Sequence, residues 1–534
     1  MIKEIEIICE NLNISKKYPI GTTLKKISKE MNIDSKHQIL GALVNNKLKE
    51  LSYQIYKPKT IRFIDYTDAD GSLMYIRSLI FVLYKAVYEL FPESKLYVRH
   101  PISKGIYCTI EKDDVFVTDF EVNRIKKMMQ AIIAQDIPFE REEMPTEKAI
   151  ELFKKHKHYA KIPLFKTRGN VYTSVYRLGE HIDYFYGVLV PSTGYLNTFD
   201  LEQFYNGMLL RFPDIKTPEK LPEKIEQKKL FRIFSEHRRW ANILKIKNIG
   251  DLNSLSGNGE ITELIKISEA LHEKKVAQIA DKIRKKRKSL RLILISGPSS
   301  SGKTTFSKRL AIQLKVNGLN PVKLSLDNYF VNRSDNPIDE NGDYDFEALE
   351  AIDLKLFNQN LLELFEGEEI EIPKFDFVTG ERYYDDEKLS IGKKDILIVE
   401  GIHGLNPLLT EYIADSAKYK IYVSAITSIA IDDHNLIKTS DNRLIRRIIR
   451  DYKYRNYSAA NTISRWPSVR SGEEKNIFPF QENADVMFNS ALLYELGVLK
   501  NYAEPILREV QPNQREYSKA QTLLKFFDYF LPIG

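Results

Sequence analysis

Residues 292–305, LILISGPSSSGKTT, combine a short apolar run with a loop whose residue types suit phosphate binding. Gly297 is followed by four residues and then by Gly302, Lys303 and Thr304, which is the spacing of a phosphate-binding loop. In such a loop consecutive backbone N–H groups surround a phosphate, the lysine contacts the β- and γ-phosphates, and the next hydroxyl ligates Mg²⁺. The sequence therefore predicts a nucleoside triphosphate site formed by Gly297, Ser299, Ser300, Ser301, Gly302, Lys303, Thr304 and Thr305.

Two carboxylates end apolar runs of the kind that form buried strands. Asp327 follows PVKLSL, and Glu400 ends DILIVE. Because ligands of open α/β sheets gather beyond the carboxyl ends of the strands, we expect both side chains near the phosphate loop. Asp327 then either accepts a proton from a hydroxyl that attacks the γ-phosphate or, as an isolated aspartate after a strand, caps a turn. Glu400 is expected to hold a Mg²⁺-bound water.

Aromatic and arginine side chains recur at regular spacing in two further segments. In EIPKFDFVTGER, Phe375 and Phe377 share one side of a short strand, either as core residues or as a platform for a base. In NRLIRRIIRDYKYR, Arg443, Arg447 and Arg450 share the helix face opposite an apolar stripe. Such a face predicts binding of the transferring phosphoryl group, because the guanidinium charge is fixed and its hydrogen bonding is bidentate.

Five motifs, in this order and spacing, resemble the uridine kinase and phosphoribulokinase family: GPSSSGKTT, LSLDNYF, IPKFDFVTGER, VEGIHGLN and RLIRRIIRD. The resemblance implies transfer of the γ-phosphate of ATP, or of GTP, to the 5′-hydroxyl of a pyrimidine nucleoside, with uridine giving UMP as the leading expectation. It implies Mg²⁺ bound by Thr304 and Glu400, and Asp327 as the catalytic base assisted by Lys303. The implied nucleoside-binding residues are Asp327, Phe330, Asp345, Phe375, Phe377 and Arg447, and the implied phosphate-binding lid contains Arg450 and Arg455.

Several positions depart from the pyrimidine kinase pattern and leave the acceptor open. A two-residue insertion makes Glu347 a competing match for Asp345. Gly380 stands where the pyrimidine kinases have a base-contacting histidine, Tyr457 replaces a nucleoside-contacting arginine, and Arg465 replaces a glutamine. A missing hydrogen-bond partner can change substrate discrimination by orders of magnitude. A kinase acting on a sugar phosphate, another sugar alcohol or another nucleoside is the alternative.

The N-terminal half resembles the threonyl-tRNA synthetases. YPIGTTLKKIS and LVNNKLKEL resemble their β-grasp TGS domain, and the segment from DADGSLMYIRSLIF to HIDYFYGVLVPSTG resembles their editing domain. At the positions of the two histidines, the cysteine and the further histidine of the editing pocket, this chain has Arg77, Phe81, Phe185 and Leu189. These side chains cannot form the metal-like cluster of the editing pocket, so the resemblance predicts a retained fold without the parent reaction.

Two roles are possible for this half of the chain. It either supports folding or oligomerisation, or it senses a ligand or binds RNA. RNA binding joined to a nucleotide-dependent switch in the other half would make the chain a regulatory protein. His156 and His158, in KKHKHYAK, are predicted to belong to a solvated basic face rather than a metal site, because no cysteine or carboxylate lies at ligand spacing.

The composition bounds the architecture that must position these residues. With 534 residues, 43% hydrophobic and 29% charged, the chain is too long for one core. We expect an α/β P-loop kinase with a mostly parallel sheet, preceded by a β-grasp domain and an α+β domain. The expected boundaries are 1–66 for the TGS-like domain, 67–245 for the editing-like domain, 246–287 for a helical linker and 288–534 for the kinase domain.

Further expectations concern surroundings and packing. No apolar stretch reaches the roughly 18 residues of a membrane span, and the N-terminus lacks a signal core, so the sequence favours a cytoplasmic protein with no membrane partner. A homo-oligomer is left open. Helices near residues 494–499 and 517–532 are expected to cover the parallel sheet.

Overall fold

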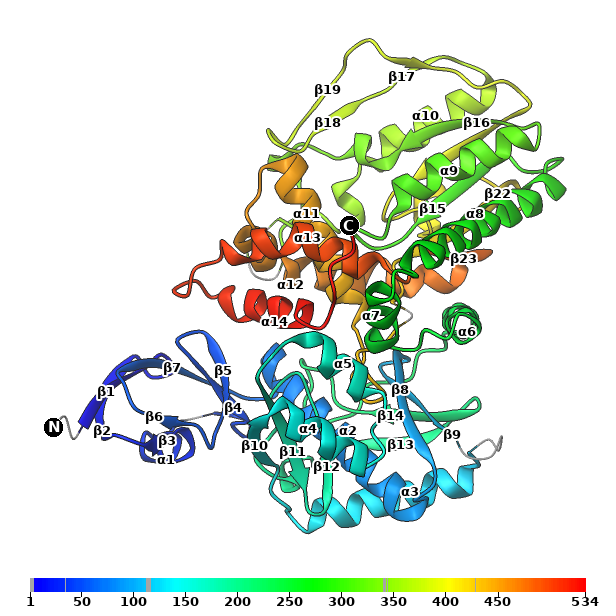
Figure 1. The fold of residues 1–534 in the computed structure, drawn as a ribbon. Coiled ribbons are helices and arrows are strands. Elements are labelled where there is room, and N and C mark those ends of the chain that lie inside the picture. The colour runs from blue at the N-terminus through cyan, green and yellow to red at the C-terminus, as the bar shows by residue number, and fades with distance from the viewer. Residues whose placement is uncertain (1–3, 34, 112–116, 340–341, 343, 428) are drawn as a thin grey trace.

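A computed structural model of the chain contains three sheet-bearing parts (Figure 1). It describes residues 4–33, 35–111, 117–339, 342, 344–427 and 429–534. The small N-terminal part lies to one side, a larger α+β part lies next to it, and the C-terminal α/β part lies above them in the view of Figure 1. Within the described ranges no helix has both the length and the apolar character needed to cross a bilayer.

The first part is a five-stranded sheet with one short helix, as expected for a β-grasp unit. In the strand order β2-β1-β7-β4-β5 the pair β1 and β7 is parallel and the other neighbours are antiparallel. Ile5, Ile7 and Cys9 are buried and alternate with exposed residues, which gives β1 one apolar face. The elements are β1 (Glu4–Cys9), β2 (Ile14–Pro19), β3 (Thr22–Thr23), α1 (Leu24–Glu30), β4 (Gly41–Val44), β5 (Lys47–Glu50), β6 (Gln54–Ile55) and β7 (Lys59–Ile64).

The second part is built around α2, which is buried along most of its length. Met74, Leu79 and Phe81 of this helix are fully buried, because its neighbours include the antiparallel sheet β13-β14-β9-β8 and helix α3. A second antiparallel sheet, β10-β11-β12, belongs to the same part. The elements are α2 (Ala69–Leu90), β8 (Lys95–Ile102), β9 (Gly105–Glu111), α3 (Asp119–Ala134), β10 (Glu140–Pro145), α4 (Thr146–Lys155), α5 (Lys161–Arg168), β11 (Tyr172–Leu178), β12 (His181–Asp183), η1 (Thr193–Tyr195), β13 (Asp200–Phe204) and β14 (Gly207–Arg211).

Three helices connect the second part to the third: α6 (Lys228–Ile243), α7 (Ile249–Gly257) and α8 (Ile261–Lys285). Asn248 begins α7 with a capping box, in which its side chain accepts a hydrogen bond from the Asp251 N–H at 3.0 Å. The long helix α8 packs against α9 (Lys303–Val316) of the third part.

The third part contains a five-stranded, fully parallel sheet, which confirms the expected P-loop kinase architecture. The strand order is β16-β21-β15-β22-β23. All five carboxyl ends therefore meet at one edge of the sheet, which is where the predicted phosphate loop, Asp327 and Glu400 lie. The strands are β15 (Leu292–Ser296), β16 (Asn320–Ser325), β21 (Asp395–Glu400), β22 (Lys418–Ser424) and β23 (Val486–Asn489).

Short elements extend this part beyond the parallel sheet. Two antiparallel pairs, β17 with β20 and β18 with β19, form a lobe at the top of Figure 1. The elements are η2 (Leu326–Tyr329), η3 (Arg333–Asp335), η4 (Leu349–Ala351), α10 (Leu354–Glu366), β17 (Ile370–Glu371), β18 (Lys374–Asp376), β19 (Glu381–Tyr383), β20 (Lys388–Leu389), η5 (Pro407–Thr410), η6 (Asp415–Ala417) and η7 (Phe478–Asn483).

The last helices do not cover the parallel sheet, so that expectation is wrong. They are α11 (Thr439–Arg455), α12 (Ala459–Asn476), α13 (Glu495–Arg508) and α14 (Tyr517–Phe527). They pack on one another, and α14 also contacts β5 of the first part. One apolar core joins Phe165 and Tyr184 of the second part to Ile249 of α7, Ile445 of α11 and Phe527 of α14. The apolar faces of these helices are therefore buried between the halves of the molecule.

Candidate active site

The phosphate loop connects β15 to α9 and has a backbone geometry that requires glycine at two positions. A side chain at Gly297 would place its Cβ 2.0 Å from the carbonyl oxygen of Val423, so only glycine fits. Gly302 has φ +89°, a left-handed conformation that glycine adopts without strain. The ammonium of Lys303 donates to the carbonyl oxygens of Gly297 at 3.0 Å and Pro298 at 3.4 Å. The lysine therefore lies across the loop, next to the N-terminus of α9.

A hydroxyl and a carboxylate meet beside this loop. Thr304 Oγ1 donates a hydrogen bond to Glu400 Oε1 at 2.7 Å. Burial raises the pKa of the Glu400 carboxyl, Lys303 opposes this effect and the carboxylate of Asp327 adds to it. Oxygen ligands of this kind suit Mg²⁺, and a divalent cation next to Glu400 would favour its ionised form. Thr304 and Glu400 thus fit the metal role expected of them.

A cavity of about 520 Å³ adjoins the phosphate loop and the strand ends. Asp327 lies in η2, immediately after β16, and lines this cavity together with Lys303. The predicted residues that line it are Ser299, Ser300, Lys303, Asp327, Phe330, Phe375, Phe377, Arg447, Arg450 and Arg455. Residues far apart in the sequence are therefore brought together in one space.

Three phenylalanines form one wall of this cavity. The ring centroids of Phe375 and Phe377 are 5.1 Å apart. The ring centroid of Phe330 lies 5.5 Å from that of Phe375 and 5.9 Å from that of Phe377. The guanidinium of Arg455 lies 4.6 Å from the centroid of Phe377. All three rings also contribute to the apolar core, since Phe330 is buried and the other two are half-buried. The wall can contact a planar ring through the surface that remains accessible.

The arginines of α11 divide into structural and cavity-facing groups. Arg443 is fully buried, pairs with Glu473 and donates through Nε to the Ser299 carbonyl oxygen at 3.1 Å. Arg447 donates through Nη1 to Ser299 Oγ at 2.8 Å, and its Nε bonds to Asp451 at 3.2 Å. Arg450 also pairs with Asp451, at 2.8 Å. Both Arg447 and Arg450 line the cavity, so the helix that carries them directly contacts the phosphate loop.

Of the two competing carboxylates, Glu347 lines the cavity and Asp345 does not. Asp345 Oδ1 instead accepts a hydrogen bond from the Glu347 N–H at 3.1 Å, which stabilises a turn. Burial raises the pKa of the Glu347 carboxyl to about 7, with Arg447 opposing and Glu473 adding to the effect. Its Oε2 is buried and has no hydrogen-bond partner among the residues that the structure describes. Glu347 therefore has an unused acceptor next to the phosphate loop, where a bound hydroxyl could donate to it.

An arginine occupies the space beside Gly380. A Cβ at Gly380 would lie 2.7 Å from Cζ of Arg333, and its φ of +82° disfavours any other residue. Arg333 lines the cavity and donates to the carbonyl oxygen of Phe377 at 3.2 Å. Arg465, also in the lining, lies 5.5 Å from the ring centroid of Phe346. Arg333, which no sequence motif marked, thus fills the space beside Gly380, and Arg465 lines the same cavity.

Glu473 was missed because no motif marks it. This fully buried carboxylate accepts a hydrogen bond from the Ser299 N–H at 3.0 Å and pairs with Arg443 and Arg470. It therefore fixes the phosphate loop to α11 and α12. In the sequence, Glu473 is only a glutamate near arginines in a helical segment. The same pattern is found in exposed ion pairs on helix surfaces, so it does not indicate a contact with the phosphate loop.

The positions of the lost editing pocket are filled by packed side chains. Phe81 and Phe185 have ring centroids 5.5 Å apart, and both are buried in the apolar core of the second part. Leu189 belongs to the same core, and the Arg77 guanidinium lies 4.9 Å from the ring centroid of Tyr186. Aromatic and apolar contacts therefore replace the functional cluster that these elements carry in the resembled editing domains.

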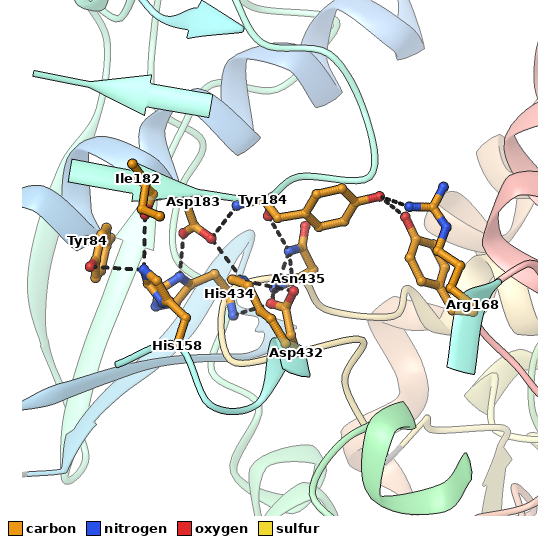
Figure 2. Close-up of polar contacts among 11 residues, drawn as sticks. Tyr84, His158, Arg168, Ile182, Asp183, Tyr184, Asp432, His434 and Asn435 are labelled. Atoms are coloured by element: carbon orange, nitrogen blue, oxygen red, sulfur yellow. Dashed lines mark hydrogen bonds and ion pairs between the residues drawn. The ribbon is translucent and has the colours of Figure 1, made fainter. Parts of the chain in front are cut away.

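His158 is not on a solvated face, so that expectation is wrong. The residue is buried, and its Nε2 lies 3.0 Å from the Ile182 carbonyl oxygen and 3.2 Å from the hydroxyl of Tyr84 (Figure 2). It follows the end of α4, where the chain turns inward even though the adjacent Lys157 is exposed. The basic neighbours in the sequence hid this change of direction.

Comparisons with known proteins give different relatives for the two halves of the chain. Residues 292–493 match the Phosphoribulokinase / Uridine kinase family. The N-terminal half is similar to threonine–tRNA ligases. The Desulforamulus reducens enzyme is 31% identical over 234 residues, which cover 42% of this chain and 36% of that enzyme. The Carboxydothermus hydrogenoformans enzyme is 30% identical over 190 residues, which cover 35% of this chain and 30% of that enzyme. The chain thus spans about a third of the length of these relatives.

Among solved structures, one described as a possible uridine kinase from Bacillus stearothermophilus is 16% identical, with a TM-score of 0.26. The match covers 38% of this chain and 89% of that chain.

Proposed function

We propose that this chain, which joins a phosphoribulokinase/uridine kinase segment to a segment similar to threonine–tRNA ligases, is an ATP-dependent kinase of the 5′-hydroxyl of a pyrimidine nucleoside, with uridine as the leading acceptor. The observation that carries the proposal is the single cavity lined by the phosphate loop, Asp327, Glu347 and three phenylalanines. A phosphoryl donor, a proton acceptor, a diol-binding carboxylate and an aromatic wall are the parts that this reaction needs.

On the donor side, backbone N–H groups of the loop and Lys303 bind the β- and γ-phosphates of ATP, with GTP as the alternative donor. Thr304 and Glu400 would hold Mg²⁺, which neutralises charge on the phosphates when it is bound. Arg447 and Arg450 face the same space and stabilise negative charge on the transferring phosphoryl group, because their charge is fixed and their geometry is bidentate.

On the acceptor side, Asp327 accepts the proton of the attacking 5′-hydroxyl, since its carboxylate lies at a strand end in the same cavity as Lys303. We infer that Glu347, rather than Asp345, accepts hydrogen bonds from the ribose hydroxyls. Phe330, Phe375 and Phe377 contact the base through their accessible surface.

The test is an acceptor panel on the full chain. Uridine, cytidine and purine nucleosides are each incubated with Mg²⁺ and ATP or GTP, and the nucleotide product is identified by mass spectrometry. Asp327→Asn should lower the rate at least 100-fold, because it removes the proton acceptor without changing its shape. Asp335→Asn, at an exposed aspartate eight residues further on, is the matched control. Absence of UMP and CMP, or an Asp327→Asn variant with the wild-type rate, would refute the proposal.

A second candidate acceptor carries its own anionic group. The cavity has five arginines, namely Arg333, Arg447, Arg450, Arg455 and Arg465. Arg333 fills the space beside Gly380, and Arg465 stands at the position of a glutamine in the resembled pyrimidine kinases. Such an excess of cations favours a sugar phosphate over a neutral nucleoside. Adding sugar phosphates to the panel distinguishes the two acceptors. Arg333→Ala should abolish use of a phosphorylated acceptor while leaving the use of a neutral nucleoside within a few-fold.

A further inference from the structure

A buried cluster of charged side chains joins the two halves of the molecule (Figure 2). Lys161 Nζ lies 2.8 Å from Asp183 Oδ1 and 2.9 Å from Asp432 Oδ2. His434 Nδ1 lies 2.5 Å from the other oxygen of Asp183. All four side chains are at most 4% exposed, and two come from each half of the chain. Charges so far from water require partners with good geometry, so the cluster fixes the relative position of the elements that supply it.

The cluster is better explained by ion pairing than by a bound metal. Within the described ranges, His158, Asp183 and His434 have ligand atoms within 4.8 Å of one another, which is a spacing that a metal could use. However, the ammonium of Lys161 already supplies a cation there. Burial alone would lower the pKa of Lys161, but the carboxylates of Asp183 and Asp432 outweigh it and raise the pKa. Burial lowers the pKa of His158 to about 3, and its Nε2 hydrogen is used by the Ile182 carbonyl oxygen.

The two residues from the C-terminal half lie in residues 429–437, here called the docking segment. This segment is bound to several N-terminal elements through its backbone and side chains. The Val98 N–H of β8 donates to the Asp433 carbonyl oxygen at 2.8 Å, and the Ile249 N–H of α7 donates to the Ala430 carbonyl oxygen at 3.0 Å. Asn435 Nδ2 donates to the Tyr184 carbonyl oxygen at 2.8 Å.

Apolar contacts anchor the same segment. Its residues Ile429, Ile431 and Ile437 are buried in the core that also contains Phe165 and Tyr184 of the second part. The docking segment therefore packs into the N-terminal half, and ion pairs, hydrogen bonds and apolar contacts together hold it there.

Both ends of the docking segment lead to the phosphate site. It follows β22, whose Val423 carbonyl oxygen lies against Gly297 of the phosphate loop. It precedes α11 by one residue, and Arg443 and Arg447 of that helix bond to Ser299 of the same loop at 3.1 and 2.8 Å. A displacement of the segment would therefore change the position of α11 relative to the bound phosphates.

We propose that Lys161, Asp183, Asp432 and His434 are positioning residues for phosphoryl transfer: through the docking segment they set the orientation of α11 and of its arginines Arg447 and Arg450. The inference rests on the proposed kinase function. It gives the N-terminal half a mechanical role in catalysis, because small misplacements of groups that act on the transition state cost large factors in rate.

The test uses the full chain and a split between turnover and binding. Asp432→Asn keeps the shape of the side chain but leaves Lys161 with one carboxylate fewer, so the segment loses its ion pair with Lys161. We expect kcat to fall about 10- to 100-fold, while the Kd for ATP in the absence of acceptor changes by less than about threefold. Thr173→Val is the matched control, because it removes a buried hydrogen bond to Thr146 that lies wholly within the N-terminal half. It should leave kcat within about twofold.

A folded Asp432→Asn variant with wild-type kcat, or one whose loss appears only in ATP affinity, would overturn the proposal. If that variant does not fold, Asn435→Ala decides by the same comparison, because it removes only the bond to Tyr184 and the local bonds to Asp432.

Hydrogen exchange separates failure of this inference from failure of the proposed function. Positioning predicts faster amide exchange in both the docking segment and α11 of Asp432→Asn, and this readout needs no substrate. Unchanged exchange in α11 would refute the positioning role even if the chain is a kinase. Faster exchange in a chain that phosphorylates nothing would leave the coupling intact and refute the proposed function instead.

Discussion

Replacing Glu347 by glutamine should raise the stability of the free protein at neutral pH and lower its activity. In the folded protein burial raises the pKa of this carboxyl to about 7, against an ordinary value of 4.5. The folded state therefore holds the proton more tightly than the unfolded state, so the stability of the wild-type protein falls as pH rises from about 4.5 to about 7. At pH values well above about 7 the stability no longer falls, because Glu347 is then ionised in both the folded and the unfolded state.

The difference between the two pKa values sets the size of the effect. At about 1.4 kcal/mol for each pKa unit, ionised Glu347 costs at most about 3 kcal/mol of folding free energy. The figure is an upper limit, because the side chain is only partly buried and faces a cavity that admits water. Glutamine resembles the protonated carboxyl and does not titrate, so it avoids this cost at every pH.

Urea unfolding at several pH values between 4.5 and 8 measures the effect. The stability of Glu347→Gln relative to wild type should increase across the interval up to pH 7 by as much as about 3 kcal/mol and then stay constant. Glu350→Gln, at an exposed glutamate in the same segment, should show a pH profile parallel to wild type. Parallel profiles for Glu347→Gln and wild type would refute the reasoning.

The same variant tests the role of the carboxylate in acceptor binding. If the ionised form accepts hydrogen bonds from two sugar hydroxyls, kcat/KM for the acceptor should rise with pH up to about 7 in wild type. Glu347→Gln should lose this dependence and about 10- to 100-fold in kcat/KM, as expected for charged hydrogen bonds. A variant that is more stable but equally active would assign Glu347 no part in acceptor binding.

Three further predictions concern the same cavity. Thr304→Val should raise the Mg²⁺ concentration needed for half-maximal activity at least tenfold, because the hydroxyl next to Glu400 is lost; a Mg²⁺ titration at fixed ATP measures it. Phe377→Ala should raise the acceptor KM about tenfold with little change in the Kd for ATP, because it removes an aromatic surface and the cation–π contact with Arg455. Gly380→His should destabilise the protein and not restore pyrimidine selectivity, since Arg333 fills the space and φ is +82°; thermal unfolding and the acceptor panel test both parts.

Local patterns predicted which residues lie at the carboxyl edge of the parallel sheet. The phosphate loop, Asp327 and Glu400 could be placed from the sequence because each lies at the end of a run that forms a strand, and carboxyl ends of parallel strands share one edge. Phe375 and Phe377 are in contact, but β18 ends at Asp376, so Phe377 lies in the following turn and not on the strand that was predicted to carry both. The predictions at the sheet edge needed only these runs and the rule for one sheet.

Contacts between distant elements could not be predicted in this way. His158 was assigned to a solvated face from its basic neighbours, but its surroundings are set by Tyr84 and by the Ile182 carbonyl, from two other elements. Glu473 contacts the phosphate loop only because α12 packs beside α11. Likewise, the choice between Asp345 and Glu347 depended on which side chain faces the cavity, and an insertion next to both had removed the alignment that would have decided it.

On the proposed kinase function, we expect the two halves of the chain to influence the reaction in different ways. The docking segment and α11 connect the N-terminal half to the phosphate loop. The lobe that carries Phe375 and Phe377 lies at the opposite end of the molecule from the N-terminal parts (Figure 1). On the proposed function, a half that acts through α11 should change mainly the rate of transfer, because Arg447 and Arg450 are proposed to stabilise the transferred group. Arg455 of the same helix also contacts Phe377, so a smaller effect on acceptor binding is expected. On the proposed function we expect the choice of acceptor to depend on the three phenylalanines, Glu347 and Arg333, which line the cavity. We expect the synthetase-like fold to act on the transfer step by holding α11 in place through the docking segment.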